Sequence, residues 1–228
     1  MHFDHADNHE TKPGGGSVLI VGRHATGQWQ VLSSRRFDFS QVGGTWNNCS
    51  GTVTPWGTIL SAEEYEPRSA DEIPDGLVKD PSLYGWMVEV DVRTGRAQKL
   101  YAMGRFSHEN AAILPDKRTV FLTDDYRGGV FFKFVADRPG DLTSGWLYAA
   151  DFQKRRWIPL PRDPQVLENA RQWALEHGAT PLDRPEDVEY NPLDGHLYLA
   201  ITGDNRKEGL AKYGQILRID PKTLKTKT

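Results

Sequence analysis

The stretch "CSGTVTPWGTILSAEE" (residues 49–64) is the first of three copies of one pattern. The other copies are "ENAAILPDKRTVFLTDD" (residues 109–125) and "EDVEYNPLDGHLYLAIT" (residues 186–202). Each copy has a proline between two strand-like segments. A possible metal ligand stands six residues before that proline: Cys49, Glu109 or Glu186. Repeated strand pairs of this kind are typical of the blades of a β-propeller.

Equivalent positions of successive propeller blades surround a common axis. We therefore expect Cys49, Glu109 and Glu186 to converge on a central channel, although they lie far apart in the sequence. The second segment of the first two copies ends in adjacent carboxylates, which we expect nearby: Glu63–Glu64 and Asp124–Asp125.

Such a gathering of anionic side chains needs cations to neutralise it. A thiolate favours a transition metal such as iron or zinc, whereas carboxylates alone suit a hard cation such as Ca²⁺. A lone cysteine such as Cys49 is more often a small buried apolar side chain, and a lone acidic pair is more often a solvated strand end. The recurrence of the pattern favours the metal site.

The composition fits a turn-rich β protein, because the 228 residues include 22 glycines and 14 prolines. A net charge of −3 without a basic stripe argues against a nucleic-acid partner. No run of 18 apolar residues occurs, so we expect no membrane span. No apolar signal core is visible either. We expect a cytoplasmic location, or a periplasmic or secreted one if an export signal lies outside these residues.

We expect residues 1–16 to form a flexible arm and residues 17–228 to form a partial β-propeller domain. One short inserted helix is predicted over residues 164–177, with Asp163 as its N-cap and Gly178 closing its C-terminus. Further hairpins are predicted at "GWMVEVDVRTGRAQKL" (85–100), "GWLYAADFQKRRWIPL" (145–160) and "GQILRIDPKTLKT" (214–226).

Three motifs resemble those of the PhoX-type alkaline phosphatases. They are "NNCSGTVTPWGTILSAEE" (47–64), "GRFSHENA" (104–111) followed by "VFLTDD" (120–125), and "GATPLDRPEDVEY" (178–190). Their order and local spacing match over roughly residues 17–221. The first motif is long and specific, and the two shorter motifs support it.

The resemblance implies an all-β propeller whose channel holds Fe³⁺ and Ca²⁺ and hydrolyses small phosphomonoesters. In such an enzyme a metal-bound water or (hydr)oxide attacks phosphorus. Arg184 would hold the phosphate, because its planar guanidinium pairs bidentately with phosphate oxygens. By the same resemblance, the metal ligands would be Cys49, Glu63, Glu64, Glu109, Asp124 and Glu186, with Cys49 on iron and Glu186 on calcium. Two further residues, His108 and Asp125, would support the ligands through hydrogen bonds.

The family propeller is similar to a closed ring of about six blades, and this chain supplies about four. We therefore expect a fragment, a truncated gene product or a reduced relative, with open sheet edges that favour self-association.

Two alternatives remain open. A calcium-dependent, lactonase-like propeller hydrolase would use the acidic residues without needing Cys49. A non-catalytic propeller module, acting in binding or as a scaffold, would need no ligand at all.

Overall fold

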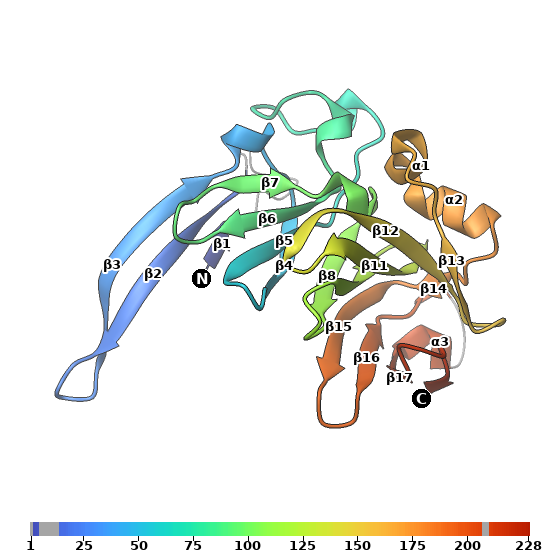
Figure 1. Ribbon diagram of the computed structural model, residues 1–228. Helices are drawn as coiled ribbons and strands as arrows, with labels where there is room; N and C mark the ends of the chain where they lie inside the picture. Colours follow the sequence, from blue (N-terminus) through green and yellow to red (C-terminus); the bar gives the residue numbers. More distant parts are fainter. Residues whose placement is uncertain (1, 5–13, 207–209) are drawn as a thin grey trace.

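The computed structural model describes residues 2–4, 14–206 and 210–228, nearly half of which lie in antiparallel strands (Figure 1). Three of its sheets follow one another along the chain, and their strands neighbour one another in chain order. The first sheet consists of β4 (Asn48–Val53), β5 (Thr58–Glu63), β6 (Met87–Asp91) and β7 (Ala97–Lys99). The second consists of β8 (His108–Ile113), β9 (Thr119–Asp124), β11 (Phe131–Arg138), β12 (Asp141–Asp151) and β13 (Arg156–Pro159). The third consists of β15 (Pro185–Asn191), β16 (His196–Ile201), β17 (Gln215–Ile219) and β18 (Thr226–Lys227).

The three copies of the sequence pattern form the first hairpin of each sheet: β4–β5, β8–β9 and β15–β16. Strand β8 lies against β4 and also against β15. Near the proline turns of these hairpins, a hollow of about 390 Å³ is lined by equivalent residues from all three copies. They are Thr52, Val53 and Pro55, then Ala112, Ile113 and Pro115, then Glu189, Tyr190 and Pro192. The three hairpins therefore surround a common space, as the repeat predicts.

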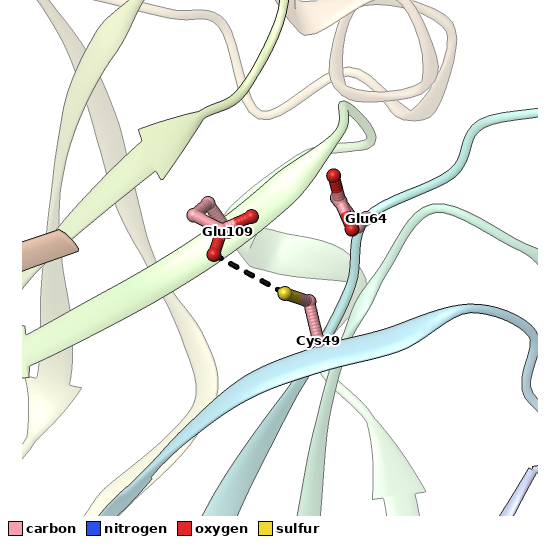
Figure 2. A group of neighbouring side chains, drawn as sticks. All are labelled: Cys49, Glu64 and Glu109. Atoms are coloured by element: carbon pink, nitrogen blue, oxygen red, sulfur yellow. Dashed lines mark hydrogen bonds between the residues drawn. The ribbon is translucent and has the colours of Figure 1, made fainter. Parts of the chain in front are cut away.

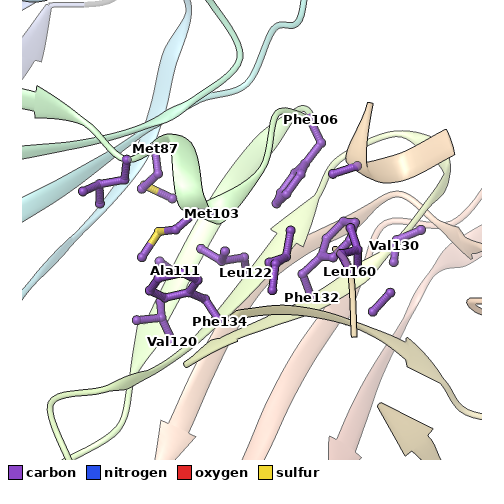
Figure 3. Close-up of a cluster of buried hydrophobic side chains, with 14 of the residues drawn as sticks. Met87, Met103, Phe106, Ala111, Val120, Leu122, Val130, Phe132, Phe134 and Leu160 are labelled. Atoms are coloured by element: carbon purple, nitrogen blue, oxygen red, sulfur yellow. The ribbon is translucent and has the colours of Figure 1, made fainter. Parts of the chain in front are cut away.

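The second sheet is buried on both faces. Side chains alternate along its strands, so Leu122 and Phe132 enter one core while Phe121 and Phe131 enter another. The first core, shared with the first sheet, is shown in Figure 3. The second core is shared with β15, β16 and β17. Burial on both faces explains why β9 and β11 read as nearly continuous apolar runs rather than as alternating ones.

The predicted helix is present, but it is interrupted at Asn169, where φ is −119° and ψ is 37°. It forms α1 (Pro164–Glu168) and α2 (Ala170–Glu176). Asp163 caps α1 as predicted, because its side chain accepts a hydrogen bond of 2.8 Å from the Gln165 amide. Gly178, at φ 95°, follows the C-terminus. Ala170 and Ala174 of α2 pack into the core shared by the first two sheets.

The remaining elements are short or stand apart from the three sheets. A long hairpin extends away from them (Figure 1). It belongs to a sheet of β1 (His2–Asp4), β2 (Gly15–Arg23) and β3 (Trp29–Asp38). A two-stranded pair joins β10 (Arg127–Gly129) to β14 (Leu182–Asp183). The helical turns are η1 (Ser40–Val42), η2 (Ala70–Glu72), η3 (Pro81–Leu83), η4 (Tyr101–Met103) and α3 (Leu210–Tyr213).

The hairpins predicted at residues 85–100, 145–160 and 214–226 are confirmed as β6–β7, β12–β13 and β17–β18. β1 pairs with residues 15–17 of β2, and the domain boundary at residue 16 stays a prediction. Residues 1 and 5–13 of the predicted arm lie outside the described part of the chain. The number of blades and the closure of a ring stay predictions. Within the described ranges, no helix combines the length and apolar character that crossing a bilayer requires.

Candidate metal centre

The first strand of each of the three sheets contains a β-bulge near its start. Asn48 pairs with Glu63 and Gly51 with Ser61, so two residues, Cys49 and Ser50, face a single partner. The same shift in register occurs between residues 108 and 111 and between residues 185 and 188. The first bulged residues are therefore Cys49, Glu109 and Glu186. A bulge turns a side chain away from the regular alternation of its strand, so this local irregularity sets where the three groups point.

The bulged residues converge in two overlapping groups. The ligand atoms of Cys49, Glu64 and Glu109 all lie within 4.8 Å of one another, and those of Glu109, Asp125 and Glu186 do as well. The Cys49 thiol donates a hydrogen bond of 3.2 Å to Glu109 Oε1 (Figure 2). Glu109 belongs to both groups. The structure thus brings together most of the residues that the sequence analysis proposed as ligands.

Each acidic pair is divided by the pleat of its strand. The second carboxylate, Glu64 or Asp125, faces the centre, and the first, Glu63 or Asp124, is buried on the other side. Equivalent backbone hydrogen bonds fix this arrangement. The Glu64 amide donates to the Asn47 carbonyl oxygen at 3.0 Å, and the Asp125 amide donates to that of Ser107 at 2.9 Å.

Glu63 does not reach the ligand groups. Its carboxylate pairs with Lys99 Nζ at 3.2 Å, and both side chains are 0% exposed. It also accepts hydrogen bonds from the amides of Trp46 and Trp86 at 3.0 and 3.1 Å. Burial raises the pKa of Glu63, and the Lys99 charge opposes that shift. Lys99 thus supplies a cation for Glu63, which lies outside both ligand groups, and its metal role stays a prediction.

Asp124 lies outside the ligand groups for the same reason. Arg171 of α2 donates to both of its oxygens, at 2.7 Å from Nε and 2.5 Å from a terminal nitrogen. The Val130 amide donates to the same carboxylate at 3.1 Å. The prediction had assigned Asp124 as a ligand and Asp125 as a supporting residue. The geometry reverses the two, because Asp125 contributes a ligand atom to the second group.

His108 is fully buried and stacks on Phe106, with ring centroids 3.7 Å apart. Its Nε2 bonds to the Gly104 carbonyl oxygen at 2.9 Å rather than to a ligand residue. Burial lowers the pKa of His108 to about 3, so the ring is neutral. This hydrogen bond does not connect His108 to a ligand residue, and the supporting role of His108 stays a prediction.

Arg184 lies at the edge of the second group. Its guanidinium contacts Asp125 Oδ2 at 2.5 Å and Glu186 Oε1 at 3.2 Å, and its side chain is 36% exposed. Its backbone is left-handed, with φ at 62°, a conformation that costs a non-glycine residue about 1–3 kcal/mol. Asn47, two residues before Cys49, has the corresponding φ of 55°. A left-handed residue thus stands two positions before the bulged residue in the first and third copies, although asparagine adopts this conformation more readily than arginine does.

Without a cation, burial and mutual repulsion raise the pKa values of three groups in the cluster. Burial raises the pKa of Glu109 to about 8, and the charges of Glu64, Glu186 and Asp125 add to the effect. Burial and the charge of Asp125 raise the pKa of Glu64. Burial and Glu109 raise the pKa of the Cys49 thiol. Bound cations would remove this penalty by favouring the deprotonated forms.

The donor atoms fit metal ions. Asp125 Oδ1 is buried and has no hydrogen-bond partner among the described residues, which is costly unless a cation takes that place. The group of Cys49, Glu64 and Glu109 mixes sulfur with oxygen and suits a transition metal. The group of Glu109, Asp125 and Glu186 offers only oxygen and suits a hard cation.

Sequence reasoning missed the two cationic partners, Lys99 and Arg171. The sequence held a signal for them, since a carboxylate near the end of a buried strand must be neutralised either by a metal ion or by a cationic side chain. Neither partner lies in the repeated pattern, so the repeat gave no means of locating them.

Comparison with known proteins places these features in context. The family model described as alkaline phosphatase PhoX matches residues 6–228. A solved structure described as Pseudomonas fluorescens PhoX in complex with vanadate, a transition state analogue, is similar with a TM-score of 0.68 and 26% sequence identity. The similarity covers 89% of this chain and 54% of that one, so this chain spans about half the length of that relative. No curated protein sequence matched the chain.

We expect Lys99→Met to lower the free energy of unfolding by about 3–5 kcal/mol, because it leaves the Glu63 carboxylate buried without its cation. The double variant Lys99→Met/Glu63→Gln should recover part of that loss. Urea denaturation measures both. Lys79→Met, which breaks an exposed ion pair with Asp75, is the control and should cost no more than about 1 kcal/mol. A loss of under 1 kcal/mol in Lys99→Met would contradict the assignment.

The metal-free protein should lose stability as the pH rises. The pKa of Glu109 is raised from 4.5 to about 8, so the folded state holds this proton more tightly than the unfolded chain does. The stabilisation is complete below pH 4.5 and disappears as the pH passes through about 8.

Urea denaturation in EDTA across this range should show a smaller pH dependence for Glu109→Gln than for the wild type. Glu189→Gln, which changes an exposed carboxylate of β15, should keep the wild-type slope. Equal slopes in all three proteins would show that Glu109 does not carry the effect.

Proposed function

The chain belongs to the PhoX alkaline phosphatase family, and from that premise we propose that it hydrolyses phosphomonoesters at the cluster around Glu109. One observation supports the proposal most strongly. Two overlapping groups of metal-ligating atoms lie beside the guanidinium of Arg184, which is partly exposed. The similarity to a PhoX structure that binds vanadate, described as a transition-state analogue, supports the same chemistry.

The two donor groups support two kinds of metal. We assign Fe³⁺ to the group with sulfur, formed by Cys49, Glu64 and Glu109, and Ca²⁺ to the oxygen-only group, formed by Glu109, Asp125 and Glu186. When bound, such cations polarise phosphoryl oxygens and lower the pKa of water. Glu109 would belong to both sites, so the loss of its side chain would disturb both metals.

Arg184 would bind the phosphate. Asp125 and Glu186 hold its guanidinium at the edge of the cluster. The left-handed backbone at Arg184 and the rigid Pro185 keep the phosphate-binding group in register with the ligand Glu186. A guanidinium offers two parallel donors to a phosphate and stabilises the charge that spreads over its equatorial oxygens in the transition state.

We interpret the three sheets as blades of a propeller, with β4, β8 and β15 as the inner strands around its channel. Their strand order and the equivalent residues that line the common hollow support this interpretation. The substrate is then a small phosphoester that enters the channel. The long exposed hairpin β2–β3 offers unpaired edges and apolar side chains through which copies can associate.

The position of Cys49 supports the phosphatase over the alternatives. A calcium-dependent, lactonase-like hydrolase needs only the carboxylates, yet the Cys49 thiol donates a hydrogen bond to Glu109, the residue that both proposed metal sites share. A scaffold would gain nothing from a carboxylate whose pKa is raised as that of Glu109 is, or from an Asp125 oxygen with no hydrogen-bond partner among the described residues.

The proposal is tested by Cys49→Ser. We expect the wild-type protein to contain a transition metal and calcium by elemental analysis and to hydrolyse p-nitrophenyl phosphate. Cys49→Ser should lose transition metal and activity together while keeping calcium. Full transition-metal content in the variant would remove Cys49 from the ligands. Calcium alone in the wild type would favour the lactonase-like alternative, and the absence of both metals would favour the scaffold.

Arg184→Ala should weaken inhibition by inorganic phosphate without changing metal content. The loss of a charge-assisted pair costs about 1.5–3 kcal/mol, which is about a 10- to 150-fold increase in the inhibition constant. Arg162→Ala, which breaks an ion pair with Asp137 at the surface, is a matched control and should leave that constant unchanged. Equal constants for Arg184→Ala and wild type would show that Arg184 does not bind phosphate.

A further inference from the structure

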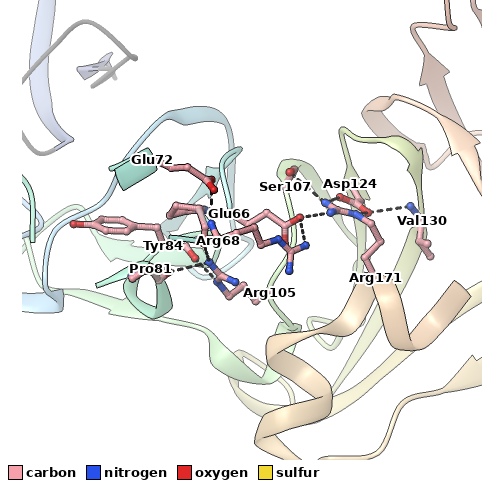
Figure 4. A network of polar contacts seen from close by, with 11 residues as sticks. Glu66, Arg68, Glu72, Pro81, Tyr84, Arg105, Ser107, Asp124, Val130 and Arg171 are labelled. Atoms are coloured by element: carbon pink, nitrogen blue, oxygen red, sulfur yellow. Dashed lines mark hydrogen bonds and ion pairs between the residues drawn. The ribbon is translucent and has the colours of Figure 1, made fainter. Parts of the chain in front are cut away.

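Arg171 reaches from the inserted helix α2 into a buried space between the first two sheets (Figure 4). Its side chain is only 7% exposed, and it lies between two acidic side chains, Glu66 and Asp124, which are 7% and 0% exposed. No other arginine side chain among the described residues pairs with two carboxylates that are both this deeply buried. Burying these three charged side chains carries a desolvation penalty, which only well-placed ion pairs and hydrogen bonds offset.

The guanidinium makes contacts through all three of its nitrogens and through one flat face. It donates to both oxygens of Asp124, to Glu66 Oε1, and to Ser107 Oγ at 3.2 Å. Its flat side lies over the Tyr126 ring, with the guanidinium carbon 4.0 Å from the ring centroid. A fork with several fixed donors and a stacking face makes these contacts at once, whereas a lysine ammonium cannot.

These contacts hold the turn that carries the candidate site. Asp124 is followed by Asp125, which supplies a ligand atom and accepts a hydrogen bond from Arg184. Tyr126, on which Arg171 stacks, accepts a hydrogen bond of 3.2 Å from the Arg184 amide through its carbonyl oxygen. Ser107, the third partner of Arg171, accepts the Asp125 amide at 2.9 Å. Arg171 therefore contacts Asp124 and Tyr126, the two neighbours of Asp125 in the chain. It also contacts Ser107, whose carbonyl oxygen accepts the Asp125 amide.

We propose that Arg171 is a positioning residue that fixes the turn 124–129, and through it the orientation of Asp125 and Arg184. It touches neither the ligand groups nor Arg184 in any described contact, so its effect is exerted through the turn. The consequence for phosphate binding rests on the proposed function, whereas the effect on the turn does not. The contribution of the inserted helix α2 to the site is thus the side chain of Arg171.

The decisive variant is Arg171→Lys, because it keeps the buried positive charge while removing the fork. Arg105→Lys is the matched control. Arg105 is also buried, at 4% exposure, but it donates to the carbonyl oxygens of Tyr84, Pro67 and Pro81, away from the turn. Both variants are compared by circular dichroism and urea denaturation to establish folding.

The first readout is hydrogen–deuterium exchange, which needs no ligand. The amides of Val130, Asp125 and Arg184 should exchange at least about tenfold faster in Arg171→Lys and at the wild-type rate in Arg105→Lys. Unchanged exchange at these amides in Arg171→Lys, or an equal increase in both variants, would overturn the proposal. If Arg171→Lys does not fold, the double variant Arg171→Met/Asp124→Asn, which removes the Arg171 and Asp124 charges, takes its place, and the criteria are then applied to the amides of Asp125 and Arg184 because Asp124 is itself the acceptor of the Val130 amide.

The second readout is binding of Ca²⁺ and inorganic phosphate by isothermal titration calorimetry. Residues that orient metal ligands from outside the site typically change metal affinity 10- to 100-fold, and we expect a loss of about that size in Arg171→Lys. Faster exchange with unchanged affinity for both probes would overturn the positioning role. If the wild type binds neither probe and does not hydrolyse p-nitrophenyl phosphate, the proposed function fails, and the exchange rates alone decide whether Arg171 fixes the turn.

Discussion

Electrostatic repulsion among buried and half-buried acidic groups is the constraint on which the rest of this structure depends. Three sheets place Cys49, Glu64, Glu109, Asp125 and Glu186 at one junction, where ligand atoms lie within 4.8 Å of one another in each of two groups. Burial in a medium of low polarity makes each additional negative charge costly, as the raised pKa of Glu109, at about 8, shows. Protons relieve this repulsion, and the proposed cations would relieve it as well, so metal binding would be coupled to the stability of the fold.

The protein limits that repulsion by dividing its acidic pairs. In both pairs the pleat sends one carboxylate to the centre and one into the body of the molecule, where a side-chain cation meets it. Lys99 from β7 serves Glu63, and Arg171 from α2 serves Asp124. The third copy has the apolar Ile201 at the corresponding position, and no cation is needed there. The division explains why adjacent acidic residues have different tasks.

The repeat in the sequence predicted the all-β architecture and the convergence of Cys49, Glu109 and Glu186, because both depend on local spacing. It did not predict which carboxylate of each pair faces the centre. That choice follows the pleat of the second strand, whose successive side chains point to opposite faces, and the repeat did not show which face looks toward the centre. Spacing likewise could not reveal Arg171, because its contact with Asp124 joins residues 47 positions apart in different elements. The predicted helix breaks at Asn169, two residues after Leu167, whose carbonyl oxygen accepts the Arg105 amide at 2.8 Å, a tertiary contact that spacing could not reveal.

The central claim is that the thiol and the carboxylates of this junction are ligands of one metal centre. X-ray absorption spectroscopy tests it most directly, at the K edge of the transition metal that copurifies with the full chain. The account predicts one sulfur scatterer at about 2.3 Å among oxygen scatterers, which disappears in Cys49→Ser. A spectrum with oxygen and nitrogen scatterers only, identical in wild type and variant, would contradict the account.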